Sequence, residues 1–237
     1  MSSNPCNDMV DSNPNDANFN GILGIGLFRQ DCGPVCERTA DNTLYFACNG
    51  GSCAAASVPV SNQLQNPVWL LPSGNNGVAL MLPSVPSSGA PSLSGSLILG
   101  IEAAAAQSPP SVVLPTNENG FVTTVYKGRT FSQSIIDSGS NGLFFPDASI
   151  PTCAAPLNGF YCPPNTLILS ATIKGVNVPF QIANTQALTG TGNAAFSNLG
   201  GDLSTFDWGL PFFLGRTVFV GIEDQDSSLG KGPFFAF

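Results

Sequence analysis

Apolar residues along this chain occur in short runs that turn-forming residues interrupt, which is the pattern of a β protein. Residues 167–173 and 176–182 carry the β-branched and aromatic residues that strands favour, and so do 120–126, 134–137 and 217–222. We expect a strand at each of these places.

The stretch 68–82 predicts two further strands, written PVWLL and GVALML, on either side of the turn sequence SGNNG. A connector rich in Pro, Ser and Gly follows at 83–92, and a second strand-rich region begins at 95–100. The alanines at 103–106 could begin a helical turn, but the Pro-Pro pair at 109–110 comes soon after, so we expect a loop there.

Composition agrees with an all-β fold. The 237 residues include 26 Gly and 20 Pro, against roughly 28 of the two together at average usage, so turns are frequent and helices short. The apolar fraction of 43% excludes a disordered chain, and the length suffices for one large β domain or two lobes.

The charged residues narrow the chemistry. The chain has no His, which excludes a Ser-His-Asp or Cys-His nucleophilic pair and a His-ligated zinc within it. Only 7 Lys and Arg stand against 15 Asp and Glu, and the net charge of -8 excludes binding of nucleic acid or anionic lipid. Carboxylates are left for acid–base chemistry, and we expect no metal and no cofactor.

No membrane span is expected. The longest apolar stretch, 96–106, contains Glu102 and falls short of the ~20 residues that cross a bilayer. Residues 1–16 are polar and acidic, so no export signal is visible.

Four of the seven cysteines form a cluster. Cys32 and Cys36 face Cys48 and Cys53 across a short segment, and we favour nested disulfides around a hairpin-like excursion. Three connectivities are open. A four-thiolate zinc site is the alternative, and this spacing fits it poorly.

The other cysteines bear on the compartment. Cys153 and Cys162 would close one short loop, and Cys6 is left without a partner. Disulfides indicate an extracytoplasmic protein that is periplasmic, secreted or on the cell surface.

One carboxylate stands in a suggestive place. Residues 134–145, SIIDSGSNGLFF, put Asp137 after an apolar strand and before a glycine turn. Backbone NH groups and small hydroxyls in such a turn can hold the carboxylate, and Gly139 lets a ligand approach closely. A carboxylate held in this way can position a water. The alternative is an aspartate that accepts hydrogen bonds from its own turn.

Three segments, in this order, resemble pepsin-like aspartic peptidases. NGILGIG at 20–26 resembles a first-lobe segment of that family, residues 134–145 its second catalytic loop, and LPFFLGRTVFVGIE at 210–223 its second-lobe apolar-glycine strand. GSLILGIE at 95–102 is a softer match. The wording FNGILGIGLFRQDCG and FDWGLPFFLGR also resembles an uncharacterised bacterial family of exported proteins with a domain of unknown function.

The resemblance implies an all-β, pepsin-like bilobal β-barrel architecture. Residues 1–94 would be the remainder of the first lobe with a disulfide-rich insertion, and 95–237 would be a complete second lobe. No first-lobe catalytic aspartate stands upstream of 20–26, so we expect a chain truncated at its amino terminus. Truncation would also explain Cys6 and the missing export signal.

The resemblance also implies roles for single residues. Asp137 would be one of two carboxylates that share a proton and a water, with a peptide or protein substrate in a cleft. Ser138 would join the two catalytic loops, Gly139 would permit their close approach, and Ser140 would orient the carboxylate. The strands that brace these loops would contain Leu23, Gly24, Leu214 and Gly215.

Arg216 departs from the pepsin pattern, which usually has an acid at this position. An arginine there could pair with a carboxylate, for which Asp147 and Asp207 are the candidates. An exposed arginine at a strand edge is the alternative.

Two functions from different classes follow. In the first, the whole protein is an exported aspartic endopeptidase, and this chain supplies half of the active site and is inactive as a monomer. In the second, it is a non-catalytic pepsin-fold binding or cell-envelope protein. A homodimer in which each chain contributes Asp137 is a third possibility, and the extra first-lobe residues disfavour it.

Overall fold

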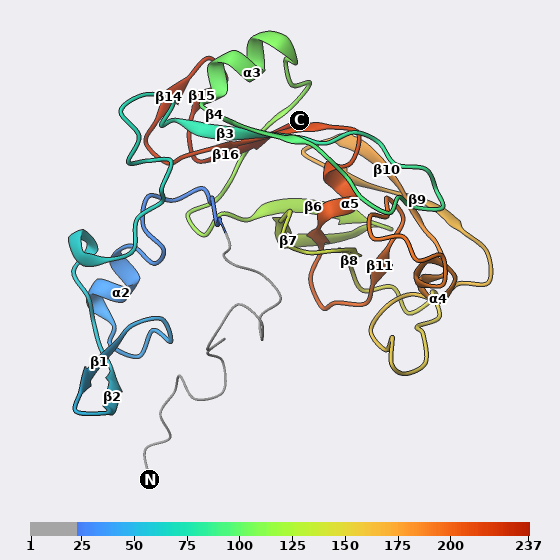
Figure 1. Cartoon of the computed structure of the whole chain (residues 1–237), viewed down its shortest axis with the longest axis horizontal. Coiled ribbons are helices and arrows are strands. Elements are labelled where there is room, and N and C mark those ends of the chain that lie inside the picture. Colours follow the sequence, from blue (N-terminus) through green and yellow to red (C-terminus); the bar gives the residue numbers. More distant parts are fainter. Residues whose placement is uncertain (1–22) are drawn as a thin grey trace.

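Two β-sheets carry most of the backbone of residues 23–237, the part of the chain that the computed structural model describes. Figure 1 shows one sheet above the other, with the short helix α5 (Leu210–Phe213) between them. The prediction of an all-β fold is confirmed at this level.

The larger sheet has seven strands and curls into a nearly closed, barrel-like form. Its strand order is β10-β9-β6-β7-β12-β8-β11. The strands are β6 (Val122–Tyr126), β7 (Arg129–Ile136), β8 (Leu143–Phe144), β9 (Leu167–Ile173), β10 (Val176–Ile182), β11 (Gly200–Gly201) and β12 (Asp207–Trp208).

The smaller sheet has five antiparallel strands in the order β4-β3-β13-β16-β5. β3 pairs with both β4 and β13, so this sheet joins residues on both sides of the lobe boundary expected between 94 and 95. The strands are β3 (Gly77–Met81), β4 (Ser96–Leu99), β5 (Val113–Pro115), β13 (Thr217–Gly221) and β16 (Phe234–Ala236).

The helices are short. The loop predicted at 103–106 is wrong, because α3 (Ile101–Gln107) covers it. Asn76 Oδ1 accepts the Ile101 N–H at 3.0 Å, and one face of the helix is buried. The prolines follow Ser108, the residue after the helix, so they end it and do not prevent it.

The remaining helices are α2 (Pro34–Arg38), the 3-10 helix η1 (Val60–Asn62) and α4 (Thr185–Thr189). Within residues 23–237 no helix has the length and apolar character needed to cross a membrane.

Not every predicted strand forms. Residues 67–71, PVWLL, form a turn, in which the Val68 N–H donates to Asn66 Oδ1 at 3.0 Å. The second half of that prediction, GVALML, is confirmed as β3. The turn buries Val68 beneath β3 without extending the sheet.

A small module of residues 34–62 lies to one side of the sheets (Figure 1). It contains α2, η1 and the hairpin β1 (Phe46–Asn49) and β2 (Ser52–Ala55). A second hairpin, β14 (Asp226–Ser227) and β15 (Gly230–Lys231), extends from the five-stranded sheet.

Two disulfides in this module correct the nested pairing, because Cys32 bonds to Cys36 and Cys48 to Cys53. The register of β1 and β2 places Cys48 directly opposite Cys53, so the hairpin itself brings these two thiols together. Sulfurs bonded in this way are not free to ligate zinc.

The third disulfide, Cys153–Cys162, is the predicted one. Three disulfides are typical of an oxidising, extracytoplasmic environment. The call on Cys6 lies outside the described residues.

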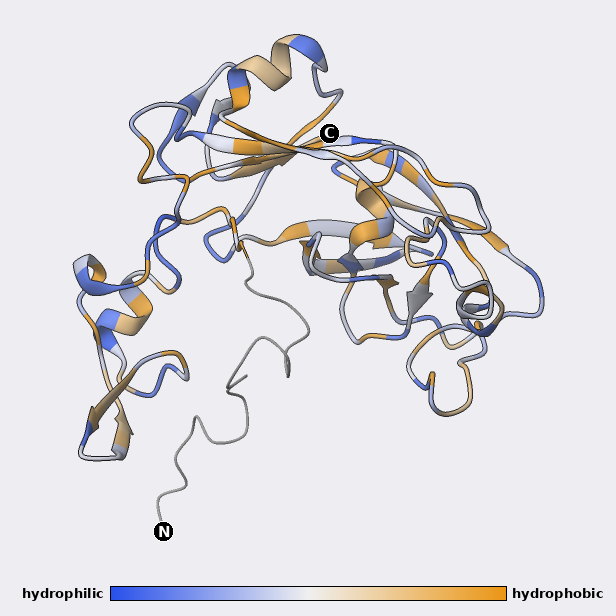
Figure 2. Ribbon diagram, viewed as in Figure 1, coloured by the Kyte–Doolittle hydropathy of each residue, from blue (hydrophilic) through white to orange (hydrophobic). Residues whose placement is uncertain are grey.

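An aromatic cluster fills the barrel-like sheet. Trp208 on β12 is fully buried and contacts Phe206 and Phe180, and its indole N–H donates to Thr124 Oγ1 at 2.9 Å. Apolar residues follow the strands of both sheets and α5 (Figure 2). The short strand β12 is therefore anchored by its own largest side chain.

Candidate functional site

The DSGS segment forms a loop, residues 137–142, between β7 and β8. Asp137 directly follows the last residue of β7, and its side chain is exposed. The Gly139 N–H donates to Asp137 Oδ1 at 2.8 Å, so the turn holds the carboxylate as expected. This contact alone is also what a simple aspartate turn would make.

The strand that braces this loop is β12. It runs parallel to β7 on one side and contacts β8 on the other. The Asp137 N–H donates to Trp208 O at 3.2 Å, and the Leu210 N–H donates to Ser140 O at 2.7 Å. Both ends of the loop are therefore tied to the segment 207–210.

Gly209 allows this close approach. A β-carbon at this position would collide with the carbonyl oxygens of Gly142 and Ser140. Only a residue without a side chain lets the backbone of 207–210 lie against the loop.

The predicted brace lies elsewhere. Leu214 and Gly215 form the turn after α5, and the Gly215 N–H donates to Leu82 O at 3.1 Å. Neither residue belongs to a strand, so this pair braces the five-stranded sheet and not the DSGS loop.

The other predicted pair, Leu23 and Gly24, is outside the strands as well. Leu23 is exposed and lines the same cavity as Asp137, whereas Gly24 lines a neighbouring one. The first residues of the NGILGIG segment, 20–22, lie outside the described residues.

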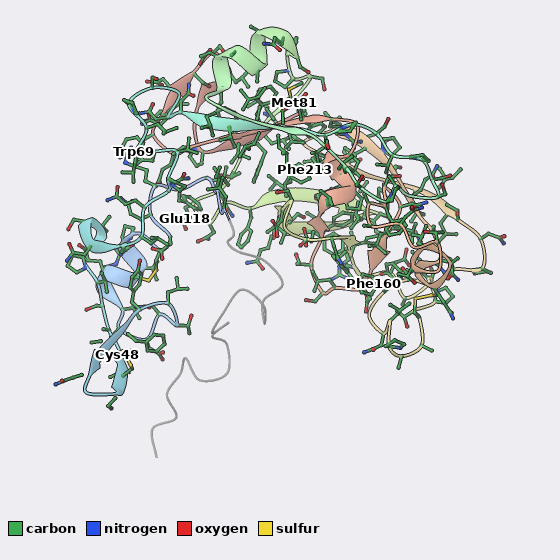
Figure 3. The ribbon with its side chains drawn as sticks, in the orientation of Figure 1. Cys48, Trp69, Met81, Glu118, Phe160 and Phe213 are labelled. Atoms are coloured by element: carbon green, nitrogen blue, oxygen red, sulfur yellow. A yellow bond between two sulfur atoms is a disulfide. The ribbon has the colours of Figure 1, made fainter. Side chains whose placement is uncertain are left out.

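Asp137 and Ser138 open onto a cavity of about 580 Å³ between the two sheets. β7 contributes Ile135 and Ile136, and Phe213 lies between the sheets (Figure 3). Most of the other lining residues are apolar: Leu23, Ile25, Leu27, Phe28, Val78, Leu80, Leu97, Val220 and Phe235. Among the described residues, Asp137 is the charged one in this lining.

A second carboxylate lies behind the loop. Asp207, on β12, is only 3% exposed and does not line the cavity. The Ser140 hydroxyl lies 2.5 Å from Asp207 Oδ2 and 3.3 Å from Asp137 Oδ2, so it connects the two carboxyl groups. The predicted contact between Ser140 and Asp137 is present.

Burial raises the pKa of Asp207 to about 6, and the charge of Asp137 adds to this effect, whereas the hydrogen bond with Ser140 opposes it. Asp207 Oδ1 is buried and has no hydrogen-bond partner. The sequence offered a signal for this residue, since a carboxylate within the apolar run FDWGLPFF is expected to be buried.

Arg216 pairs with neither of its expected partners. Its guanidinium donates to Phe212 O at 2.6 Å and lies over the Phe212 ring. Asp147 is paired with Lys127 at 2.8 Å, and Asp207 is bonded to Ser140. The backbone turn after α5 holds the arginine against its own helix.

No group of three or more His, Cys, Asp or Glu side chains within residues 23–237 could hold a metal ion. What the described site offers is a held carboxylate beside an apolar cavity. Such a carboxylate can accept a proton from a water or from a bound polar group.

Comparison with known proteins gives a family and no activity. The family model described as "Protein of unknown function (DUF3443)" matches residues 1–237. No curated protein and no solved structure matches the chain. None of these comparisons links it to the pepsin-like aspartic peptidases, whereas the expected membership in a family of unknown function is confirmed. The chain belongs to the DUF3443 family, whose members are of unknown function.

Proposed function

We propose that this protein is an exported hydrolase of the aspartic endopeptidase type, in which Asp137 accepts a proton from the attacking water. The observation that carries the proposal is the held, exposed carboxylate of Asp137 at the edge of a cavity of about 580 Å³. A peptide or protein is the substrate class that this chemistry serves.

The surroundings of the loop support the proposal. The Gly139 N–H and the Ser140 hydroxyl contact different oxygens of Asp137, which fixes the plane of the carboxylate. The strand β12 ties both ends of the loop to a buried tryptophan. A general base must be positioned before its basicity matters, and this loop is positioned by its own backbone.

The aspartic mechanism needs a second carboxylate facing the same water. Asp207 cannot take this role, since it is buried and does not line the cavity. We propose that the second carboxylate comes from outside residues 23–237 or from another copy of the chain.

The alternative is a binding protein of the cell envelope that performs no chemistry. The lining of the cavity favours it, because apolar side chains there outnumber polar ones and Asp137 is the charged residue among those described. Such a site would hold an apolar group and need no partner carboxylate. In both cases the three disulfides fit a periplasmic, secreted or surface protein.

The test is hydrolysis of an unfolded protein by the whole protein at acid pH. We expect cleavage that a hydroxyl-containing mimic of the tetrahedral transition state inhibits. Asp137→Asn should reduce it by about 10²-fold or more. Asp41→Asn is the matched control, because Asp41 is exposed and lies outside the cavity lining. Cleavage that survives Asp137→Asn would rule out this assignment.

A further inference from the structure

Ser140 has one proton to donate and two carboxyl groups within reach. Its hydroxyl oxygen lies 2.5 Å from Asp207 Oδ2 and 3.3 Å from Asp137 Oδ2. A serine hydroxyl donates one hydrogen bond and can accept two, while an ionised carboxylate only accepts. If both aspartates were ionised, one of these two contacts would be oxygen against oxygen with no proton between.

A single added proton resolves the conflict. If Asp207 is protonated, its O–H donates to Ser140 Oγ, and the Ser140 O–H donates to Asp137. Each contact then has one donor and one acceptor. The shorter of the two contacts, at 2.5 Å, is the one that a carboxylic acid donor would make.

The surroundings of Asp207 decide which carboxyl group holds the proton. Asp137 is exposed, whereas Asp207 is 3% exposed and its Oδ1 has no hydrogen-bond partner. An ionised carboxylate needs donors for both oxygens, and a neutral acid needs fewer. The proton therefore belongs on Asp207.

The charged groups around Asp207 agree. The loop 137–142 presents Asp137, which repels a second negative charge. β7 pairs with β12 at Ile135 and Ile136 and carries its one charge, Arg129, at the opposite end. β8 and α5, the other elements beside β12, have no charged residue. No cation among these elements is placed to neutralise an ionised Asp207.

We propose that Asp207 is a positioning residue that carries a proton and, through Ser140, fixes Asp137 as a hydrogen-bond acceptor at the cavity. The assignment of the proton stands on the contacts alone, and its role in catalysis rests on the proposed function. When Asp207 loses the proton, the Ser140 hydroxyl turns to Asp207 and Asp137 loses this bond. The loop thus works best on the acid side of that ionisation.

The test is a titration of the carboxyl carbons by NMR, with ¹³C-labelled aspartate in the whole protein. We expect the Asp207 signal to titrate with a midpoint near pH 6, about 2 pH units above an ordinary aspartate. The Asp137 signal should change over the same pH range. Ser140→Ala should move the Asp207 midpoint to still higher pH, because it removes the donor to the ionised form.

Ser138→Ala is the matched control, since this neighbouring hydroxyl lines the cavity and should leave the Asp207 midpoint unchanged. A midpoint of Asp207 at or below the ordinary aspartate value overturns the proposal, and the wild-type titration decides this even if a variant fails to fold. An Asp137 signal that stays constant while Asp207 ionises overturns it as well.

Activity separates this inference from the proposed function. Asp207→Asn keeps a donor toward Ser140 at every pH, so it should extend the alkaline limit of hydrolysis, whereas Asp207→Leu should not. Loss of the expected titration in an active enzyme refutes the inference alone. An inactive protein with the expected titration refutes the proposed function alone.

Discussion

The backbone N–H of Asp137 donates to the carbonyl oxygen of Trp208 at 3.2 Å, so the exposed candidate base is tied to a fully buried residue. This bond connects the mobile requirement of a site, an open carboxylate, with the rigid interior that positions it. The stability of β12 and the geometry of the DSGS loop should therefore change together.

Truncation of Trp208 tests this link. Trp208→Ala should lower the free energy of unfolding by about 3–5 kcal/mol, because it empties the core and leaves Thr124 without its indole donor. Trp69→Ala is the control, since Trp69 is half-buried beneath Arg29 and its loss should be smaller. Urea unfolding measures both. Equal losses in the two variants would contradict the anchoring role of Trp208.

The glycine beside it should be equally restrictive. Gly209→Ala should cost about 1–3 kcal/mol, because the added carbon meets the Gly142 and Ser140 carbonyl oxygens and pushes the loop away from β12. Gly24→Ala, where a β-carbon meets nothing within 4 Å, should be close to neutral. Thermal unfolding of both variants checks this. A Gly209→Ala protein of unchanged stability would mean that the loop does not lie against this strand.

Much of the sheet could be predicted because its strands have local signals. The predicted bounds of β9 and β10 are the observed ones, since each is a continuous run of strand-forming residues. The helix α3 was missed because its alanines carry no strand or core pattern by themselves. Its cap comes from Asn76, a residue distant in sequence.

The brace could not be chosen from sequence because the segment 208–215 contains two apolar-glycine pairs, Trp208–Gly209 and Leu214–Gly215. Either pair can lie beside a loop on grounds of size. What decides between them is the parallel register of β12 with β7, which places Trp208 beside Ile136. Register between distant strands is a tertiary property that no local pattern encodes.

The same limit applies to the carboxylates. Asp137 was predicted from the DSGS wording, and the hydrogen bonds from its turn were expected from the chemistry of glycine and serine. Asp207 was considered only as a partner for Arg216, which instead bonds to its own helix. Its contact with Ser140 joins residues 67 positions apart, so only the folded chain reveals it.

The raised pKa of Asp207 predicts how stability depends on pH. Its folded pKa of about 6 lies above the usual value, so the folded protein binds the proton more tightly than the unfolded chain does. The contribution to stability is complete below about pH 4 and is lost as pH rises through about 6, a loss of up to about 3 kcal/mol.

Asp207→Asn cannot ionise and should not show this loss. Urea unfolding between acid and neutral pH should therefore find the variant gaining on the wild type as pH rises, whatever their difference at acid pH. A stability difference that is constant with pH would contradict the shifted pKa.

Asp147 should show the opposite pH dependence. Burial would raise the pKa of Asp147, but hydrogen bonds from Lys127, Ser149 and Tyr126 outweigh it and hold the pKa below the ordinary value. The side chain is 7% exposed, and its Oδ2 lies 2.8 Å from Lys127 Nζ and 2.6 Å from the Tyr126 hydroxyl. These bonds stabilise the ionised form, so this contribution is present above the unfolded pKa and is lost as pH falls below it.

Asp147→Asn should lower the free energy of unfolding at neutral pH by about 1–3 kcal/mol, because it weakens charged hydrogen bonds in a buried place. The difference from the wild type should shrink as the pH falls below about 4, where the unfolded aspartate takes up its proton. Asp226→Asn, at an exposed position on β14, is the control and should change little at any pH. Urea unfolding of the three proteins over this pH range measures the effect. If Asp147→Asn gained stability relative to the wild type as pH rose, the sign of its pKa shift would be wrong. The two buried aspartates, Asp207 and Asp147, would then respond to pH in the same direction, which their different hydrogen-bond partners forbid.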